Sequence, residues 1–144
     1  MTRAVLIALL AILFCAPAGA QSRVLLVTDQ ASPIETLSSF EVRKLYLGIS
    51  VFSNGHAIRP LRNMTDSRLN DTFLQSVVGL SEESYSRRLL ANVFKFGTVR
   101  PDEYRNSERL AQALHSNPYA ISYIWVSGTL PPGLKVLRVL WQDY

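Results

Sequence analysis

The chain has 144 residues, of which 48% are hydrophobic and 18% charged, and its formal net charge at pH 7 is +4. This length supports one folded domain with one hydrophobic core. A single cysteine excludes a fold held together by internal disulfides. The weak positive charge is spread along the chain, so it indicates ordinary solvation and does not predict a nucleic-acid-binding surface.

Residues 1–20 have the three-part layout of a secretory signal peptide. A basic residue precedes an apolar run, and a small-x-small cleavage site ends at Ala20. The run is shorter than the ~20 apolar residues that span a bilayer, which weighs against a retained membrane anchor. Cys15 raises a lipoprotein alternative, although the bulky Phe14 precedes it. We therefore predict export and one mature domain, 21–144, without a transmembrane segment.

A strand and a capped helix begin the mature domain. The apolar, β-branched run 23–28 predicts a buried strand. Ser38 and Glu41 have the S-x-x-E spacing of a capping box, and Gly48 is the residue type that usually ends a helix. The apolar side of this helix is expected to carry Phe40, Leu45, Tyr46 and Leu47.

A tight turn follows. Two short strands, 51–52 and 57–61, flank the segment 53–56, whose Asn-Gly pair favours positive φ angles. Pro60 cannot donate a backbone hydrogen bond, so its strand is expected to lie at a sheet edge or to end there.

Three further helices are predicted from caps and apolar spacing. Asp66 caps one that runs to about Val78, Ser81 caps one that stops at Gly97, and Ser107 caps a short one. The residues expected to face inward are Leu69, Phe73, Val77, Val78, Leu89, Leu90, Val93, Phe94, Leu110 and Leu114.

The C-terminal part contains the strongest strand signal. A polar loop over 98–106 precedes the last helix, a strand is predicted over 120–126, and a half-exposed strand over 134–140. Helices mixed with strands in one small unit predict an α/β fold with helices packed on a small sheet. Three aromatics, Tyr119, Tyr123 and Trp125, occupy alternate positions and are expected to share one side of this strand. They could pack in the core, or they could form an exposed aromatic face that contacts a partner.

Four phrases in one order carry a family resemblance. They are LSSFEVRKLYLG over 37–48, FSNG over 52–55, FLQSVVG over 73–79, and FKFG through NPYAISY over 94–123. In this order and spacing they resemble the second lobe of periplasmic phosphate-binding proteins, the type 2 solute-binding fold of ABC importers. The resemblance implies a single lobe of that fold, with a small mixed sheet flanked by helices, in a periplasmic protein.

The resemblance also implies an oxyanion ligand. Arg62 matches the family's arginine, but the Ser-Gly-Thr segment that follows it in the family is missing from 63–68. Complete members grip the anion between two lobes, whereas the mature chain has the length of one. A dimer or a partner would then be needed to complete the cleft.

The residues around the predicted start of the second helix are a candidate anion site. Helix N-terminal amides with guanidinium and hydroxyl donors can hold an oxyanion such as phosphate. The alternative is a capped helix, in which Asp66 takes the same amides. The candidate residues are Arg62, Thr65, Ser67 and Arg68.

The sequence gives little support for a metal site or for catalysis. His56 and His115 are far apart, and the mature chain has no cysteine, so no metal or cofactor is expected. A triad of Ser67, His56 and an aspartate lacks the G-x-S-x-G motif, and we expect no enzyme.

Two functions therefore stay open. The first is a periplasmic solute-binding-like protein that binds phosphate or a similar oxyanion, as the phosphate-binding component of an ABC transporter does. The second is a non-catalytic interaction module that keeps the fold without the ligand, as an accessory to an envelope transporter or signalling receptor. Fold by itself does not decide between them.

Overall fold

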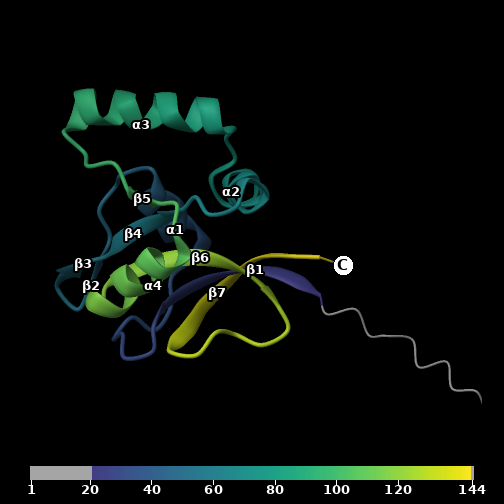
Figure 1. The fold of residues 1–144 in the computed structure, drawn as a ribbon. Coiled ribbons are helices and arrows are strands. Elements are labelled where there is room, and N and C mark those ends of the chain that lie inside the picture. The colour runs from purple at the N-terminus through teal and green to yellow at the C-terminus, as the bar shows by residue number, and fades with distance from the viewer. Residues whose placement is uncertain (1–20, 144) are drawn as a thin grey trace, which may run out of the picture.

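The computed structural model describes residues 21–143, and Figure 1 shows how their helices and strands are arranged. The predicted signal peptide and its cleavage after Ala20 lie outside the described residues. Five strands form one mixed sheet in the order β5-β4-β6-β1-β7, and helices flank it. The expected α/β class is confirmed.

The antiparallel half of the sheet contains the three longest strands. β1 (Ser22–Asp29) lies between β6 (Ala120–Ser127) and β7 (Leu134–Gln142), and it is antiparallel to both. All three strands were expected from the sequence, because each is a long run of apolar and β-branched residues.

The parallel half corrects two sequence predictions. β4 (Arg59–Asn63) is parallel to β6 on one side and to β5 (Asp102–Tyr104) on the other, so the predicted loop 98–106 contains a strand. The expectation that Pro60 marks an edge strand is wrong for β4 as a whole. Pairing with β5 begins only at Leu61, so the missing N–H of Pro60 interrupts no ladder bond there.

A two-residue turn forms the predicted hairpin. β2 (Phe52–Ser53) pairs with β3 (His56–Ala57), and the two residues between them both have positive φ. Asn54 has φ of 50° and Gly55 of 78°, as an Asn-Gly hairpin turn requires.

The helices begin at the expected places, with one shift. They are α1 (Ser39–Tyr46), α2 (Ser67–Phe73), the π-helical turn η1 (Leu74–Val78), α3 (Glu82–Phe96) and α4 (Ser107–Ser116). The caps at Ser38, Asp66 and Ser81 are confirmed. The last helix is capped by Asn106 instead of Ser107, because the Asn106 side chain accepts from the next exposed amides.

The helices cover both faces of the sheet. Residues of α1, α2, η1 and the first half of α3 pack on one face, together with Val24 and Leu26 of β1. α4 packs on the other face with Leu25 and Val27. A strand buried on both sides reads as a continuous apolar run, which explains the sequence of β1.

Several residues expected in the core lie at the surface. Phe40 of α1 and both Leu90 and Phe94 of α3 are exposed, while Val77 and Val93 are only partly buried. Of the residues in α3, only Tyr85 and Leu89 are buried, and Figure 1 shows this helix as the outermost element on its side of the sheet. The apolar spacing of α3 therefore does not correspond to a core-facing stripe.

The three aromatics of the β6 region have different environments. Tyr123 is buried and stacks on Phe73, with ring centroids 3.6 Å apart. Trp125 is partly exposed and stacks on Trp141 of β7, and Tyr119 is half-buried. Core packing therefore accounts for Tyr123 but not for the whole set.

Candidate functional site

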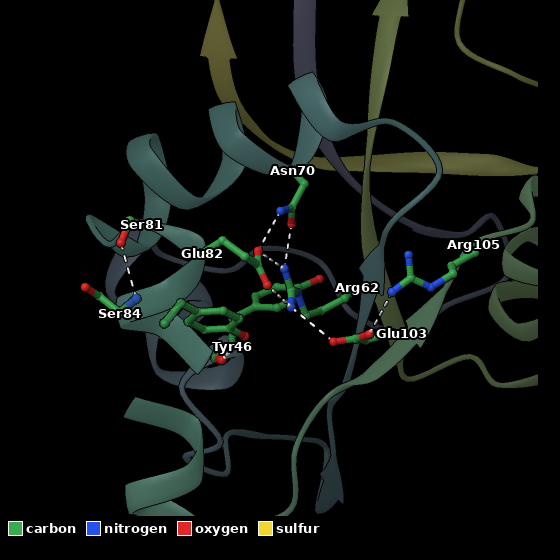
Figure 2. A network of polar contacts seen from close by, with 9 residues as sticks. Tyr46, Arg62, Asn70, Ser81, Glu82, Ser84, Glu103 and Arg105 are labelled. Atoms are coloured by element: carbon green, nitrogen blue, oxygen red, sulfur yellow. Dashed lines mark hydrogen bonds and ion pairs between the residues drawn. The ribbon is translucent and has the colours of Figure 1, made fainter. Parts of the chain in front are cut away.

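Arg62 of β4 is a buried cation surrounded by polar partners. Its side chain is 1% exposed, which is unusual for arginine unless it is paired. Nη2 donates to Asn70 Oδ1 at 2.6 Å and to Glu82 Oε2 at 3.0 Å. Nη1 donates to Glu82 Oε1 at 3.4 Å and to Glu103 Oε1 at 3.3 Å. Figure 2 shows these carboxylates and the amide converging on the guanidinium.

The partners of Arg62 come from three elements. Asn70 lies in α2, Glu82 in the first turn of α3 and Glu103 in β5; with Arg62 they form what we call the Arg62 cluster. Asn70 Nδ2 also donates to Glu82 Oε2 at 2.7 Å. Both carboxylates are about 40% exposed, so they are on the solvent side of the guanidinium. The cluster therefore ties α2 and α3 to the parallel end of the sheet.

Three tyrosines line the apolar side of the cluster. The Tyr85 ring centroid lies 4.7 Å from Arg62 Cζ, within cation–π range. Its hydroxyl donates to the Tyr46 carbonyl at 2.5 Å, and the Tyr46 hydroxyl donates to the Leu61 carbonyl at 3.0 Å. Burial raises the pKa of Tyr46 and Tyr85 and takes that of Tyr123 to about 12. All three phenols are therefore neutral at neutral pH, and the hydroxyls of Tyr46 and Tyr85 act as donors.

Both members of the Arg62–Glu82 pair are charged. Burial by itself raises the pKa of Glu82, but hydrogen bonds from Arg62 and Asn70 outweigh it and hold that pKa below its ordinary value. Burial by itself lowers the pKa of Arg62, but the hydrogen bond to Glu82 leaves it above its ordinary value. The positive charge of Arg62 is thus already balanced within the protein.

Two buried side-chain polar atoms are left without a hydrogen-bond partner among residues 21–143. They are Nε of Arg62 and the hydroxyl of Tyr123. A buried unsatisfied group costs on the order of 1–3 kcal/mol, and such groups in proteins commonly hold a water or an ion. Arg62 Nε is therefore the buried donor of the cluster that no protein group satisfies, and the Tyr123 hydroxyl is a second buried polar atom without a partner.

The start of α2 is closed by a side chain of the protein itself. Asp66 Oδ1 accepts from the backbone N–H of Arg68 at 2.8 Å and of Leu69 at 3.3 Å. Thr65 turns its hydroxyl away to donate to Asn63 Oδ1 at 2.6 Å, and its backbone N–H donates to the same oxygen. Two of the helix N-terminal amides that would hold an anion, those of Arg68 and Leu69, are therefore occupied by a carboxylate.

The structure places the four predicted anion-site residues in two settings. Thr65, Ser67 and Arg68 are exposed at the start of α2, whereas Arg62 is buried with its own partners. Their role as an anion site stays a prediction.

Sequence reasoning did not identify the partners of Arg62. The sequence predicts a polar loop over 98–106, which contains Glu103, and singles out neither Glu82 nor Asn70 as a partner of Arg62. The one general signal is that a buried arginine requires hydrogen-bond acceptors, and the burial of Arg62 is known only from the fold. The acceptors themselves are far away in sequence, and only the fold brings them to Arg62.

Other candidate groups of the sequence have structural contacts. His115 Nδ1 lies 2.6 Å from Asp29 Oδ1, and this hydrogen bond lowers the pKa of the Asp29 carboxyl. His56 stacks on Tyr119 with ring centroids 4.5 Å apart. In residues 21–143 there is no group of three or more metal-ligating His, Cys, Asp or Glu. Within the same residues, none of the helices is long and apolar enough to cross a bilayer.

Comparison with solved structures identifies the fold. A protein of Clostridium perfringens, assigned as a phosphate ABC transporter substrate-binding protein and crystallised with bound phosphate, matches with a TM-score of 0.62 and 21% identity. The match covers 83% of this chain and 45% of that one. The fold is that of a phosphate-binding-protein lobe. This confirms the resemblance stated from the four sequence phrases, at the level of fold.

A second binding protein gives the same result. An ABC-type phosphate transport receptor from Vibrio cholerae matches with a TM-score of 0.59 and 17% identity, over 83% of this chain and 46% of that one. The chain thus spans about half the length of these solved proteins. No protein-family model matches the chain, and no curated protein matches its sequence.

Proposed function

We propose that the chain is a non-catalytic interaction module of the periplasm, built on a phosphate-binding-protein lobe and acting as an accessory to an envelope transporter or signalling receptor. The observation that carries this proposal is the Arg62 cluster. The guanidinium that matches the family's arginine is bonded to two carboxylates and an amide of the protein itself.

Electrostatics favour this reading over a phosphate site. An oxyanion reaching Arg62 would approach Glu82 and Glu103, and one at the start of α2 would approach Asp66. Two unit charges 4 Å apart interact by roughly 4 kcal/mol at an effective dielectric constant of 20. Repulsion from each nearby carboxylate therefore opposes the charge-assisted hydrogen bonds, each of about 1.5–3 kcal/mol, that an anion would form there.

Oxyanion binding is the second candidate. It is supported by the phosphate bound in the solved Clostridium perfringens protein of the same fold. It is also supported by the unpaired Nε of Arg62 and the exposed side chains of Ser67 and Arg68. In this case a dimer or a partner would complete the cleft, and the predicted site residues Arg62, Thr65, Ser67 and Arg68 would hold the anion.

Anion titration separates the two candidates. The protein is expressed from the full chain, purified, and melted in phosphate and sulfate up to 10 mM, a range chosen to cover about a hundredfold excess over a 0.1 mM Kd. At that excess a ligand bound only by the folded state stabilises it by ~2.7 kcal/mol. We expect no saturable shift. Arg109→Gln, at an exposed position of α4, is the matched loss of one positive charge.

A saturable phosphate shift would overturn the interaction module in favour of the second candidate. It would need to be lost in Arg68→Gln and kept in Arg109→Gln, because only the first of these residues belongs to the predicted site. Export is checked separately by the N-terminus of the purified protein, which is expected to begin at Gln21 and to come from the periplasmic fraction.

A further inference from the structure

An open groove lies beside α3, on the face where this helix contacts the loop after α1. Its walls are the second half of α3, the segment 97–102, residues 47–50 and the start of β4, and its volume is about 1070 Å³. We call it the α3 groove. Its floor is apolar and includes the buried side chains of Leu47, Ile58 and Pro101.

Internal contacts hold the walls of the α3 groove in place. Asn92 Nδ2 donates to the Leu47 carbonyl at 2.9 Å, which joins α3 to the end of α1. Gly48 has φ of 87°, and a Cβ built on it would lie 3.2 Å from Thr98 Oγ1, so the two loops are closely packed. The groove is therefore preformed and does not depend on a ligand to shape it.

The rim of the α3 groove exposes large apolar side chains. Phe96 is 73% exposed and Val99 82%, and Ile49 stands at the opposite side. Leu90 and Phe94 extend the exposed apolar surface along α3 beyond the groove. Apolar surface gathered at one place on a folded protein marks a contact site.

Four positive charges at the α3 groove have no ion-pair partner among residues 21–143. Arg88 and Arg100 line it, and a shallow depression that shares Arg88, Asn92 and Phe96 with it adds Arg87 and Lys95. Within residues 21–143, the ion pairs and side-chain hydrogen bonds involve none of these four cations; the other lining arginine, Arg59, is paired with Asp102. The groove is thus complementary to negative charge.

Shape and charge together select one kind of occupant. A flat anionic membrane would not fill a concave groove with an apolar floor. A second copy of this chain would bring its own Arg87, Arg88 and Lys95 against the same cations, with only Glu83 on the exposed side of α3 to offset them. A protein segment with apolar side chains beside carboxylates would fill the apolar floor and pair with the cations around it.

We infer that the α3 groove docks a segment of another protein in which apolar residues alternate or cluster with aspartate and glutamate. This inference rests on the proposed interaction function and names its surface and its kind of partner. The apolar side chains of the segment fill the floor, and its carboxylates pair with Arg88 and Arg100.

Peptide selection tests the inference. The purified protein is used to select from a phage library of random twelve-residue peptides, and enriched peptides are measured by fluorescence anisotropy. We expect peptides that combine carboxylates with apolar residues, and an affinity that falls at least tenfold between 50 and 500 mM NaCl. Arg88→Glu with Arg100→Glu, and Phe96→Ser with Val99→Ser, should each weaken binding at least tenfold.

Matched variants keep the result specific to the groove. Arg109→Glu on α4 and Val139→Ser on β7 change an exposed arginine and an exposed valine elsewhere, and they should leave affinity within twofold. Equal melting temperatures across the set show that the groove variants are folded. No enrichment, enrichment of peptides without carboxylates, or binding that the groove variants do not weaken would overturn the inference.

Further outcomes would identify a different occupant of the groove, or would distinguish failure of the groove inference from failure of the proposed function. Groove-dependent binding to vesicles of phosphatidylglycerol, or a groove-dependent dimer in sedimentation, would replace the segment by a membrane or a second copy. Failure of peptide selection with no phosphate shift would leave the interaction module standing without this groove. A phosphate shift lost in Arg68→Gln would overturn the interaction module itself, whatever the peptides do.

Discussion

At the scale of single residues, Arg62 is the residue that matches the family's arginine, and its hydrogen bonds within the protein make it less available to an external anion. It lies on a strand that places it beneath α2 and α3, where only charged or amide acceptors can offset the cost of burying a guanidinium. Glu82, Glu103 and Asn70 supply those acceptors. The same bonds that stabilise the buried charge reduce its capacity to attract an external anion.

Removing the charge of Arg62 should destabilise the fold. Breaking a buried ion pair costs about 3–5 kcal/mol, and the partial exposure of both carboxylates places this case at or below the lower end. We expect Arg62→Met to lose about 2–3 kcal/mol in urea unfolding, and Arg109→Met less than ~0.5 kcal/mol. Adding Glu82→Gln to Arg62→Met should recover part of the loss. An Arg62→Met protein as stable as the wild type would show that the cluster contributes no net stability.

Acid should weaken the cluster through Glu82. Its pKa is lower in the folded than in the unfolded state, so its contribution is fully present above the unfolded value, near 4.5, and is lost as pH falls through the folded value. We expect the stability gap between wild type and Glu82→Gln, about 1 kcal/mol at pH 7 given the exposure of Glu82, to shrink between pH 5 and pH 3. Urea unfolding at each pH measures this gap. A gap independent of pH would contradict the ion pair.

At the scale of elements, helix ends are decided locally and helix faces are not. The capping box of Ser38 and Glu41 and the cap at Asp66 form within one turn of chain, so their spacing in the sequence is sufficient to find them. The faces depend on what packs against the helix. In α3 the predicted inward residues Leu90 and Phe94 meet solvent, because no element covers the second half of that helix.

β7 shows the same limit for a strand. The sequence predicts a half-exposed strand over 134–140, but the pairing of β7 with β1 shifts register twice. Each shift moves the following residues to the other face. Leu137 is consequently the buried residue of the strand, and Val136 and Val139 are exposed.

Two substitutions of Asp66, the N-cap of α2, distinguish the contribution of its charge to stability from that of its hydrogen bonds. Asp66→Ala removes two acceptor contacts and should cost about 1 kcal/mol, whereas Asp66→Asn keeps an equally good cap and should stay within ~0.5 kcal/mol. Thermal or urea unfolding measures both. Equal losses in the two variants would mean that the charge of Asp66, and not its hydrogen bonds, stabilises the start of the helix.

The two halves of α3 should differ in local stability. Backbone amides of residues 90–96 are expected to exchange with solvent much faster than those of β1, because that half of α3 buries no large side chain fully while β1 is buried on both faces. Hydrogen-exchange mass spectrometry resolves the two segments. If the amides of residues 90–96 exchanged as slowly as those of β1, the exposed face of α3 would be covered in solution. The exchange of these amides should then also be measured with a groove-binding peptide present.

At the scale of the whole molecule, one sheet joins two apolar layers. Val24 and Leu26 of β1 belong to the layer under α1 and α2, and Leu25 and Val27 to the layer under α4. Because the same strand serves both layers, neither can unfold without exposing the other. This shared strand is the physical basis for expecting residues 21–143 to behave as one domain.

Substitutions on opposite faces of β1 test that expectation. Leu25→Ala and Leu26→Ala each remove a buried leucine and should cost about 3 kcal/mol. Each should shift a single cooperative transition, with circular dichroism and tryptophan fluorescence coinciding. Separate transitions for the two probes, or a second transition in one variant only, would show that the layers unfold independently.

What the sequence determined by itself was local or carried in a repeated order of phrases. Caps, the Asn-Gly turn and the three long strands follow from interactions within a few residues, and the order of four phrases was sufficient to indicate a binding-protein lobe. Only the tertiary structure decided the partners of Arg62, the strand β5 and the exposure of Phe94. Each depends on residues distant in sequence: Glu82 and Glu103 lie 20 and 41 positions from Arg62, and no local pattern specifies which distant acceptor a buried charge will meet.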